Sequence, residues 1–413
     1  MSNGSRLILY ERPHAPISIR AAFFAGSRFD PEGKEGVAHF LEHMLLAGSA
    51  RFPTKDKLAV HIEQYGGGFQ AFTGADTLGI EVSVGDPADL IYACEILHEI
   101  LLEPLFDERT METERGSILR ERANKRSNPS SMLWELWRKT FFQGTPVGRS
   151  TLGSEETINA ISKDDLVGFR AAHLVSGQAC FIASGGIKME ELREDFEKAL
   201  IVPRSEPFSF EEDLPIYRER PVLIEPYTKT DQVHLMYGFR APRALHADGP
   251  ALEVIAKMLG GGRASILQRM LRYEKGLVYD SSAFSTTMGD CGSWMAMTST
   301  SRDKVKEVLR TISGEVRRVM NDGLTEEELA FVKNKIMRSS LMKMQTSASW
   351  VDLHADLEPF NRNGIWTLAD QLEAIGAVTP AMTRDVARRY FGPDKWFLAA
   401  CGDIQEDELD IPW

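Results

Sequence analysis

The spacing of apolar residues along the chain changes between two periods. Apolar residues at every second position, as at Ile80, Val82 and Val84, predict strands, whereas a spacing of three to four residues predicts helices. Helical spacing begins at residue 87, directly after this alternation. In chain order we expect strands at 7–10, 17–25, 70–84 and 179–184, the first two paired with each other, and helices at 36–48, 55–64, 87–102, 107–121, 134–142 and 163–173.

The second half of the chain repeats part of this pattern. Residues 161–166 resemble 378–384, and residues 180–185 resemble 397–402, at one constant spacing. Phe106 to Glu108 likewise resembles the stretch that begins at Leu324. Such spacing indicates a diverged internal repeat, so we expect two domains of similar fold.

A proline-rich, charged stretch lies between the two repeats. Its composition is typical of a linker, and its prolines are Pro203, Pro207, Pro215 and Pro221. The length of 413 residues also exceeds what a single hydrophobic core usually serves. We therefore expect domains at 1–202 and 221–413, with a linker at 203–220.

The overall charge excludes some functions. The net charge of −12 argues against a general nucleic-acid binder. No early apolar run resembles a signal peptide, and none is long enough to span a bilayer, so we expect a cytoplasmic protein that does not contact membranes. A processed start would instead place it in the periplasm or an organelle. The four cysteines lie far apart and predict neither a disulfide framework nor a cysteine metal site.

A short motif near the N-terminus carries the chemistry. His39 and His43 stand four residues apart, which places both imidazoles on one face of a helix. Glu42 precedes the second histidine, giving the order H-x-x-E-H. Two imidazoles suit Zn²⁺, and a neighbouring carboxylate can take a proton from the water that the metal activates. The alternative is two surface histidines on an amphipathic helix.

A catalytic zinc site usually needs a third protein ligand. The charged helix expected at 107–121 offers Glu112, Glu114 and Glu121, and the last two lie on nearly the same face because seven residues separate them. Helical geometry alone does not choose among these three glutamates.

The motif, with Glu114 and Glu121 far downstream, resembles the pitrilysin-type (inverzincin) family of zinc metallopeptidases. The resemblance implies that His39, His43 and Glu121 bind one Zn²⁺ per chain and that Glu42 is the general base. It also implies that Glu114 supports the ligands from outside the metal's own shell.

Two flanking stretches agree with this resemblance. The turn Gly26-Ser27 to Asp30-Pro31 precedes the motif, as in the family. The stretch that follows the glycines at 66–68 resembles the family's Asn-Ala-x-Thr, at an edge strand that pairs with substrate, although a glutamine replaces the asparagine. The implied substrate-binding residues are Gln70, Ala71, Phe72 and Thr73.

The second half lacks the ligands but has a motif of its own. If the repeats align, Glu121 corresponds to Ser339 and Glu114 to Val332, so no second metal site is expected. The glycines at 260–262 lack the Gly-Lys-Ser/Thr of a phosphate-binding loop. The stretch 271–279 resembles the family's L-R-x-x-x-G-L-x-Y, which implies that Tyr279 binds the developing oxyanion and that Arg272 positions substrate. The alternative is a core tyrosine and a surface arginine.

The resemblance covers nearly the whole chain and implies an α+β fold. Each domain would be a mostly antiparallel sheet backed by helices, and the chain would form half of a clamshell. The implied function is a zinc-dependent endopeptidase that cleaves oligopeptides or unfolded segments in a closed chamber, as a homodimer or as a heterodimer with a related subunit. The alternatives are a processing peptidase for one leader or precursor peptide and a non-catalytic, peptide-binding subunit.

Overall fold

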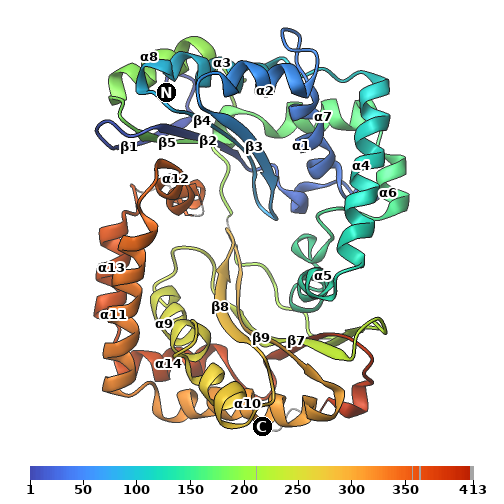
Figure 1. Ribbon diagram of the computed structural model, residues 1–413, viewed down its shortest axis with the longest axis vertical. Helices are drawn as coiled ribbons and strands as arrows, with labels where there is room; N and C mark the ends of the chain where they lie inside the picture. Colours follow the sequence, from blue (N-terminus) through green and yellow to red (C-terminus); the bar gives the residue numbers. More distant parts are fainter. Residues whose placement is uncertain (211, 356, 362–363, 410–413) are drawn as a thin grey trace. The chain divides into compact units, whose positions relative to one another are not determined.

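The computed structural model describes residues 1–210, 212–355, 357–361 and 364–409 (Figure 1). These residues form two compact units, each built on a five-stranded sheet. The first sheet has the strand order β1-β5-β2-β4-β3. Its strands are β1 (Arg6–Glu11), β2 (Ile17–Phe23), β3 (Gly68–Thr73), β4 (Leu78–Val84) and β5 (Ala179–Gly185).

One expected strand pairing is wrong. β1 does not pair with β2, because β5 lies between them, parallel to β1 and antiparallel to β2. Every residue of β5 is buried, and a strand that is apolar on both faces belongs in the interior of a sheet. The other neighbouring pairs in this sheet, β2 with β4 and β4 with β3, are antiparallel, which leaves β3 at an edge.

The second sheet repeats this arrangement strand for strand. Its order is β6-β10-β7-β9-β8, with one parallel pair, β10 with β6, and antiparallel pairs elsewhere. The prediction of two similar α+β domains with mostly antiparallel sheets is confirmed. The strands are β6 (Val222–Glu225), β7 (Gln232–Ala241), β8 (Ser281–Thr287), β9 (Gly292–Ser301) and β10 (Trp396–Cys401).

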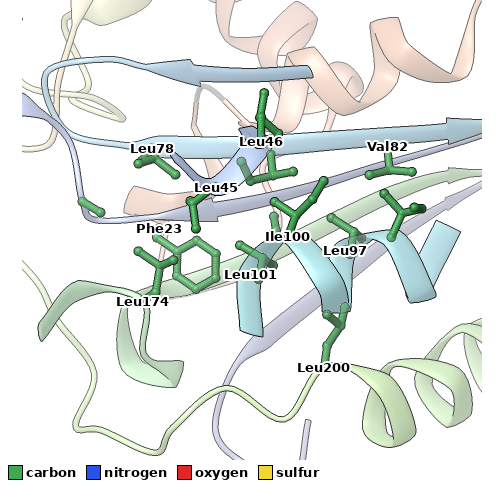
Figure 2. Close-up of a cluster of buried hydrophobic side chains, with 14 of the residues drawn as sticks. Phe23, Leu45, Leu46, Leu78, Val82, Leu97, Ile100, Leu101, Leu174 and Leu200 are labelled. Atoms are coloured by element: carbon green, nitrogen blue, oxygen red, sulfur yellow. The ribbon is translucent and has the colours of Figure 1, made fainter. Parts of the chain in front are cut away.

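Helices supply the hydrophobic core on one face of each sheet. In the first unit, Leu45 and Ile100 pack with Phe23 and Leu78 of the sheet, as Figure 2 shows. The helices that contribute to this core are α1 (Val37–Ala47), α2 (Lys55–Glu63), α3 (Leu90–Leu102), α4 (Glu108–Arg126), α6 (Glu155–Ala160), α7 (Lys163–His173) and α8 (Met189–Ala199). In the second unit they are α9 (Gly249–Gly260), α10 (Val305–Asp322), α11 (Glu326–Lys343), α13 (Leu368–Ala377) and α14 (Pro380–Tyr390).

The opposite face of each sheet is covered by a helix from the other half of the chain. Helix α12 (Ser347–Ala355) packs on β2 and β5 (Figure 1). Its residues Val351 and Ala355 belong to a buried cluster with Ile8 of β1 and Ile182 of β5. Helix α5 (Pro129–Phe141) packs on β10, β7 and β6 of the second sheet. The compact units therefore interleave along the chain. Of the described residues, the first unit contains 1–122, 149–209 and 341–366, and the second contains 123–148, 210–340 and 367–409.

The domain boundaries 1–202 and 221–413, with a linker at 203–220, stay a prediction. Each sheet is covered by a helix from the other half of the chain, α12 on the first and α5 on the second, and the local sequence pattern did not predict this exchange of helices. Among the described residues, no helix is both long enough and apolar enough to cross a membrane.

Candidate metal centre

The motif helix α1 begins at a cap that the upstream turn provides. Gly36 adopts a left-handed conformation with φ of 100°, and a Cβ there would lie 2.9 Å from the carbonyl oxygen of Leu152. The Asp30 carboxylate accepts hydrogen bonds from the backbone N–H groups of Gly36 (2.7 Å) and Ala38 (3.0 Å). Asp30 therefore satisfies N–H groups that a helix start leaves without partners, and its charge suits the positive end of the helix dipole.

The apolar residues of α1 fix which way its polar residues point. Phe40, Leu41, Met44 and Leu45 are fully buried in the core of the first unit. This leaves His39 and His43 side by side on the remaining surface, with ring centroids 4.8 Å apart. The side chain of His39 is 8% exposed and that of His43 is 23% exposed, so both imidazoles are largely shielded from solvent.

The contacts of Arg115 fix how α4 is rotated about its own axis, and this rotation determines which of its glutamates face α1. Its guanidinium donates to the backbone carbonyls of Ile158 and Ile161 and lies over the ring of Phe40, 5.1 Å from the ring centroid. With Arg115 buried on one side, Glu114 and Glu121 face α1. Glu112 is 68% exposed and pairs with Arg115 instead. This orientation separates the three glutamates that helical geometry left open.

The resulting cluster suits a divalent metal. Glu121 Oε2 lies 3.6 Å from His39 Nε2 and 3.7 Å from His43 Nε2. One donor atom from each of His39, His43 and Glu121 lies within 4.8 Å of the others, and a group of this kind is found once among the described residues. Two imidazole nitrogens and one carboxylate oxygen are ligands that Zn²⁺ accepts in catalytic sites.

Glu114 lies behind His43. Its Oε2 is 2.9 Å from Nδ1 of His43, on the opposite side of the ring from the nitrogen that faces Glu121. Metal-binding histidines commonly donate their second N–H to a carboxylate in this way. Burial disfavours the charged imidazolium, but hydrogen bonds with Glu114 and Glu121 outweigh burial and raise the pKa of His43 to about 9. The carboxylates thus favour positive charge at this position.

Glu42 lies beside the edge strand. Its Oε2 accepts a hydrogen bond from Thr73 Oγ1 at 2.5 Å. Thr73 is the last residue of β3, which also carries the other three residues predicted to bind substrate, Gln70, Ala71 and Phe72. Phe72 packs its ring over Gly79, where a Cβ would lie 2.0 Å from the ring, and Arg20 covers it from 4.5 Å.

Arg272 and Tyr279 lie in the second unit, next to each other. Arg272 belongs to a π-helix at Gln268–Glu274, a rare element that is frequent at functional sites. Its guanidinium lies 4.6 Å from the centroid of the Tyr279 ring, and Tyr279 is 80% exposed. The exposure is inconsistent with the alternative of a core tyrosine. At the start of the same π-helix, the buried Gln268 accepts hydrogen bonds from the backbone N–H and the hydroxyl of Ser281.

The structure thus brings the residues predicted for the site together in two groups. The first unit holds His39, His43, Glu121, Glu114 and Glu42, with β3 beside Glu42. The second holds Arg272 with Tyr279. Sequence reasoning did not find the supporting roles of Asp30 and Arg115. An aspartate six residues before a glycine at a helix start was the available signal for Asp30, and a lone arginine in a charged helix gave none for Arg115.

Comparisons with known proteins place these observations in a wider context. The protein-family model described as "Insulinase (Peptidase family M16)" matches residues 8–155 of the sequence. A second family model, described as "Peptidase M16 inactive domain", matches residues 160–336. An uncharacterized zinc protease of Streptomyces coelicolor is 26% identical over 95% of this chain and 86% of its own length. The mitochondrial-processing peptidase subunit beta of Bos taurus is 27% identical over 98% of this chain and 84% of its own length.

Solved structures share the fold. The peptidase M16 inactive domain from Pseudomonas fluorescens superimposes with a TM-score of 0.89 at 19% identity, covering 98% of this chain and 97% of that chain. A protease from Helicobacter pylori gives a TM-score of 0.86 at 19% identity, over 97% and 98% of the two chains. These proteins therefore have the same overall fold as this chain.

Proposed function

The chain belongs to the insulinase family of peptidases, family M16, and we propose that it is a zinc-dependent endopeptidase that hydrolyses oligopeptides or unfolded segments. The observation that carries this proposal is the group of His39, His43 and Glu121 with Glu42 on the same helix as the two histidines. Metal ligands beside a carboxylate that is not a ligand form the arrangement that metal-assisted peptide hydrolysis needs.

In this proposal His39, His43 and Glu121 would hold one Zn²⁺ per chain, and Glu114 would orient His43 through its Nδ1. A bound Zn²⁺ supplies a Lewis acid that polarises the peptide carbonyl and acidifies water. Glu42 takes a proton from the attacking water and later delivers it to the leaving amine.

The edge strand β3 provides a place for the peptide. β3 pairs with β4 on one side, so the backbone groups on its other side can pair with an added strand. Gln70, Ala71, Phe72 and Thr73 would line that strand. Thr73 at its end contacts Glu42, so a peptide that pairs with β3 would pass close to the general base.

Tyr279 and Arg272 complete the proposal. The exposed phenol of Tyr279 would donate to the oxyanion that develops during attack, and Arg272 would position substrate or the phenol. Replacing Tyr279 with phenylalanine should lower kcat roughly 100-fold, as for loss of one oxyanion donor, and leave zinc content unchanged. Steady-state kinetics with metal analysis measures both, and an unchanged kcat would remove Tyr279 from the mechanism.

Two chains would close into a chamber around the peptide. Both motifs are present on this chain, which permits a homodimer. A heterodimer with a related subunit is the second arrangement, since one relative is named as a subunit of a processing peptidase. The alternatives to a general oligopeptidase are a processing peptidase for one leader or precursor peptide and a non-catalytic subunit. Broad cleavage of a panel of unrelated peptides would exclude the dedicated processing peptidase.

The decisive experiment compares the unchanged protein with Glu42→Gln. Zinc content and cleavage of a quenched fluorescent peptide are measured for both. We expect about one zinc per chain in each, as a single three-ligand site requires, and cleavage by the unchanged protein alone. A protein that binds zinc and cleaves nothing, with or without a related subunit, would favour the non-catalytic alternative. A protein that binds no metal would overturn the proposed site.

A further inference from the structure

The contact between Thr73 and Glu42 joins the edge strand to the proposed general base. Thr73 Oγ1 donates to Glu42 Oε2 in a short hydrogen bond between partly buried groups. A hydrogen bond to a charged acceptor is about twice as strong as one between neutral groups. A carboxylate held at one oxygen has its plane restricted, so the direction of its second oxygen is restricted as well.

The hydroxyl of Thr73 is itself held in place. Threonine is branched at Cβ, and few rotamers are open to it on a strand. The turn after it is tied down, because Gly74 donates to the carbonyl oxygen of Thr77 (2.8 Å) and Ser27 donates to that of Gly74 (3.0 Å). The buried ion pair between Arg28 and Asp76, at 2.8 Å, holds the same turn. The segment that precedes α1 therefore fixes the end of β3.

We propose that Thr73 is a positioning residue for Glu42, because its hydroxyl orients the carboxylate while only its backbone is left to pair with the peptide. This inference rests on the proposed function and deepens it. Because Thr73 ends the strand on which the peptide would lie, the same residue serves strand pairing through its backbone and base orientation through its hydroxyl. The contact therefore holds Glu42 in place beside the strand on which the peptide would lie.

The test uses a matched pair of variants in the full chain. Thr73→Val keeps the shape and removes the hydroxyl, and Thr73→Ser keeps the hydroxyl. We expect Thr73→Val to lower kcat at least tenfold, with KM within about twofold and zinc content unchanged, and Thr73→Ser to stay within a few-fold of the unchanged protein. A raised KM with unchanged kcat would make Thr73 a substrate contact. Equal losses in both variants would make its role one of packing.

A second readout does not depend on catalysis. A double-mutant cycle combines Thr73→Val with Glu42→Ala in metal-free protein and follows the midpoint of urea unfolding. We expect Thr73→Val to lower the midpoint in the unchanged background and to have little effect once Glu42 is gone. Shifts that add fully would overturn the proposal. If the two substitutions are coupled but the unchanged protein cleaves no peptide, the contact between Thr73 and Glu42 is supported and the proposed peptidase function is rejected.

Discussion

The two sheets of this protein have the same strand order and different chemistry. In the first unit, α1 and α4 bring two histidines and two glutamates together. In the second, α9 carries no histidine, and α11 has Val332 and Ser339 where the repeat aligns Glu114 and Glu121. Val332 is fully buried, and the Ser339 hydroxyl bonds to the carbonyl of Ile336 on its own helix. The fold therefore does not require the ligands, and their presence in one unit points to function.

The starts of the two equivalent helices differ in the same sense. Asp30 caps α1 through two backbone N–H groups. Asp248 precedes α9 but makes no such bond with its side chain, and it pairs with Arg389 and accepts from the Tyr390 hydroxyl (2.9 Å). Helix α1 therefore begins with side-chain hydrogen bonds to its backbone that Asp248 does not provide for α9. Such a start suits a helix that carries two of the three proposed metal ligands.

Glu121 of α4 and Ser339 of α11 occupy equivalent positions in the two repeats, and replacing each tests whether only the first binds metal. Glu121→Gln should weaken zinc binding more than about 100-fold, because loss of an outer partner alone can cost 10- to 100-fold and Glu121 is a proposed ligand. Ser339→Ala is the matched control and should leave zinc binding unchanged. Titration with a competing chelator measures both. If both substitutions weakened zinc binding equally, Glu121 would not be a metal ligand that sets the first repeat apart from the second.

The next effect concerns a buried arginine in each unit. Arg20 forms ion pairs with Glu81 and Asp352, and the Glu81 side chain is 7% exposed. Arg240 instead lies over the ring of Phe142 and donates to backbone carbonyls. Arg20→Met leaves a buried carboxylate uncompensated and should cost about 3–5 kcal/mol of unfolding free energy. Arg240→Met removes bonds to neutral carbonyls and a coulombic attraction to the buried Asp290, which is the smallest of the effects on the Arg240 pKa, and it should cost about 1–3 kcal/mol.

Urea denaturation of both arginine variants orders these two effects. A larger loss for Arg240→Met would mean that the ring contact and the carbonyls matter more than the ion pair. Glu81→Gln in the Arg20→Met background provides the control, because it removes the charge that the first substitution exposes. It should recover part of the lost stability.

Asp30 and Asp248 stand at the starts of α1 and α9, and replacing either should have a small effect on stability. Asp30→Ala removes a cap and should lower the unfolding free energy by about 1 kcal/mol. Asp248→Ala removes an ion pair with an arginine whose side chain is 58% exposed, and it should lower stability by well under 1 kcal/mol. Asp30→Ala should also weaken zinc binding, whereas Asp248→Ala should not. Thermal unfolding with and without zinc separates the two.

Much of the first unit could be predicted from local pattern. The four-residue spacing of His39 and His43 required only helical geometry, and the alternation at Ile80 to Val84 marked β4. The internal repeat predicted that the second unit would copy the first. Helical spacing could not decide among Glu112, Glu114 and Glu121, because the rotation of α4 depends on where Arg115 is anchored, more than 40 residues along the chain.

The features that sequence reasoning did not predict depend on distant contacts. Strand β5 lies between β1 and β2 although it follows them by about 160 residues in the sequence, and local pattern does not show such a distant pairing. The exchange of α5 and α12 follows from which apolar surface remains uncovered once the sheets have formed, and periodicity carries no information on that. The contact of Thr73 with Glu42 likewise joins two elements whose proximity only the folded sheet sets.

The interleaving of the units has a consequence for biosynthesis. The first sheet has all its strands once residue 185 has been made, but the helix that covers its second face ends at residue 355. At typical elongation rates this face waits roughly ten seconds or more for its cover. Until then the apolar surface around Ile8 and Ile182 is open to chaperones or to other nascent chains. The first unit is therefore complete only when α12 has been made. A chain released before residue 355 would leave the ribosome with one face of its first sheet uncovered.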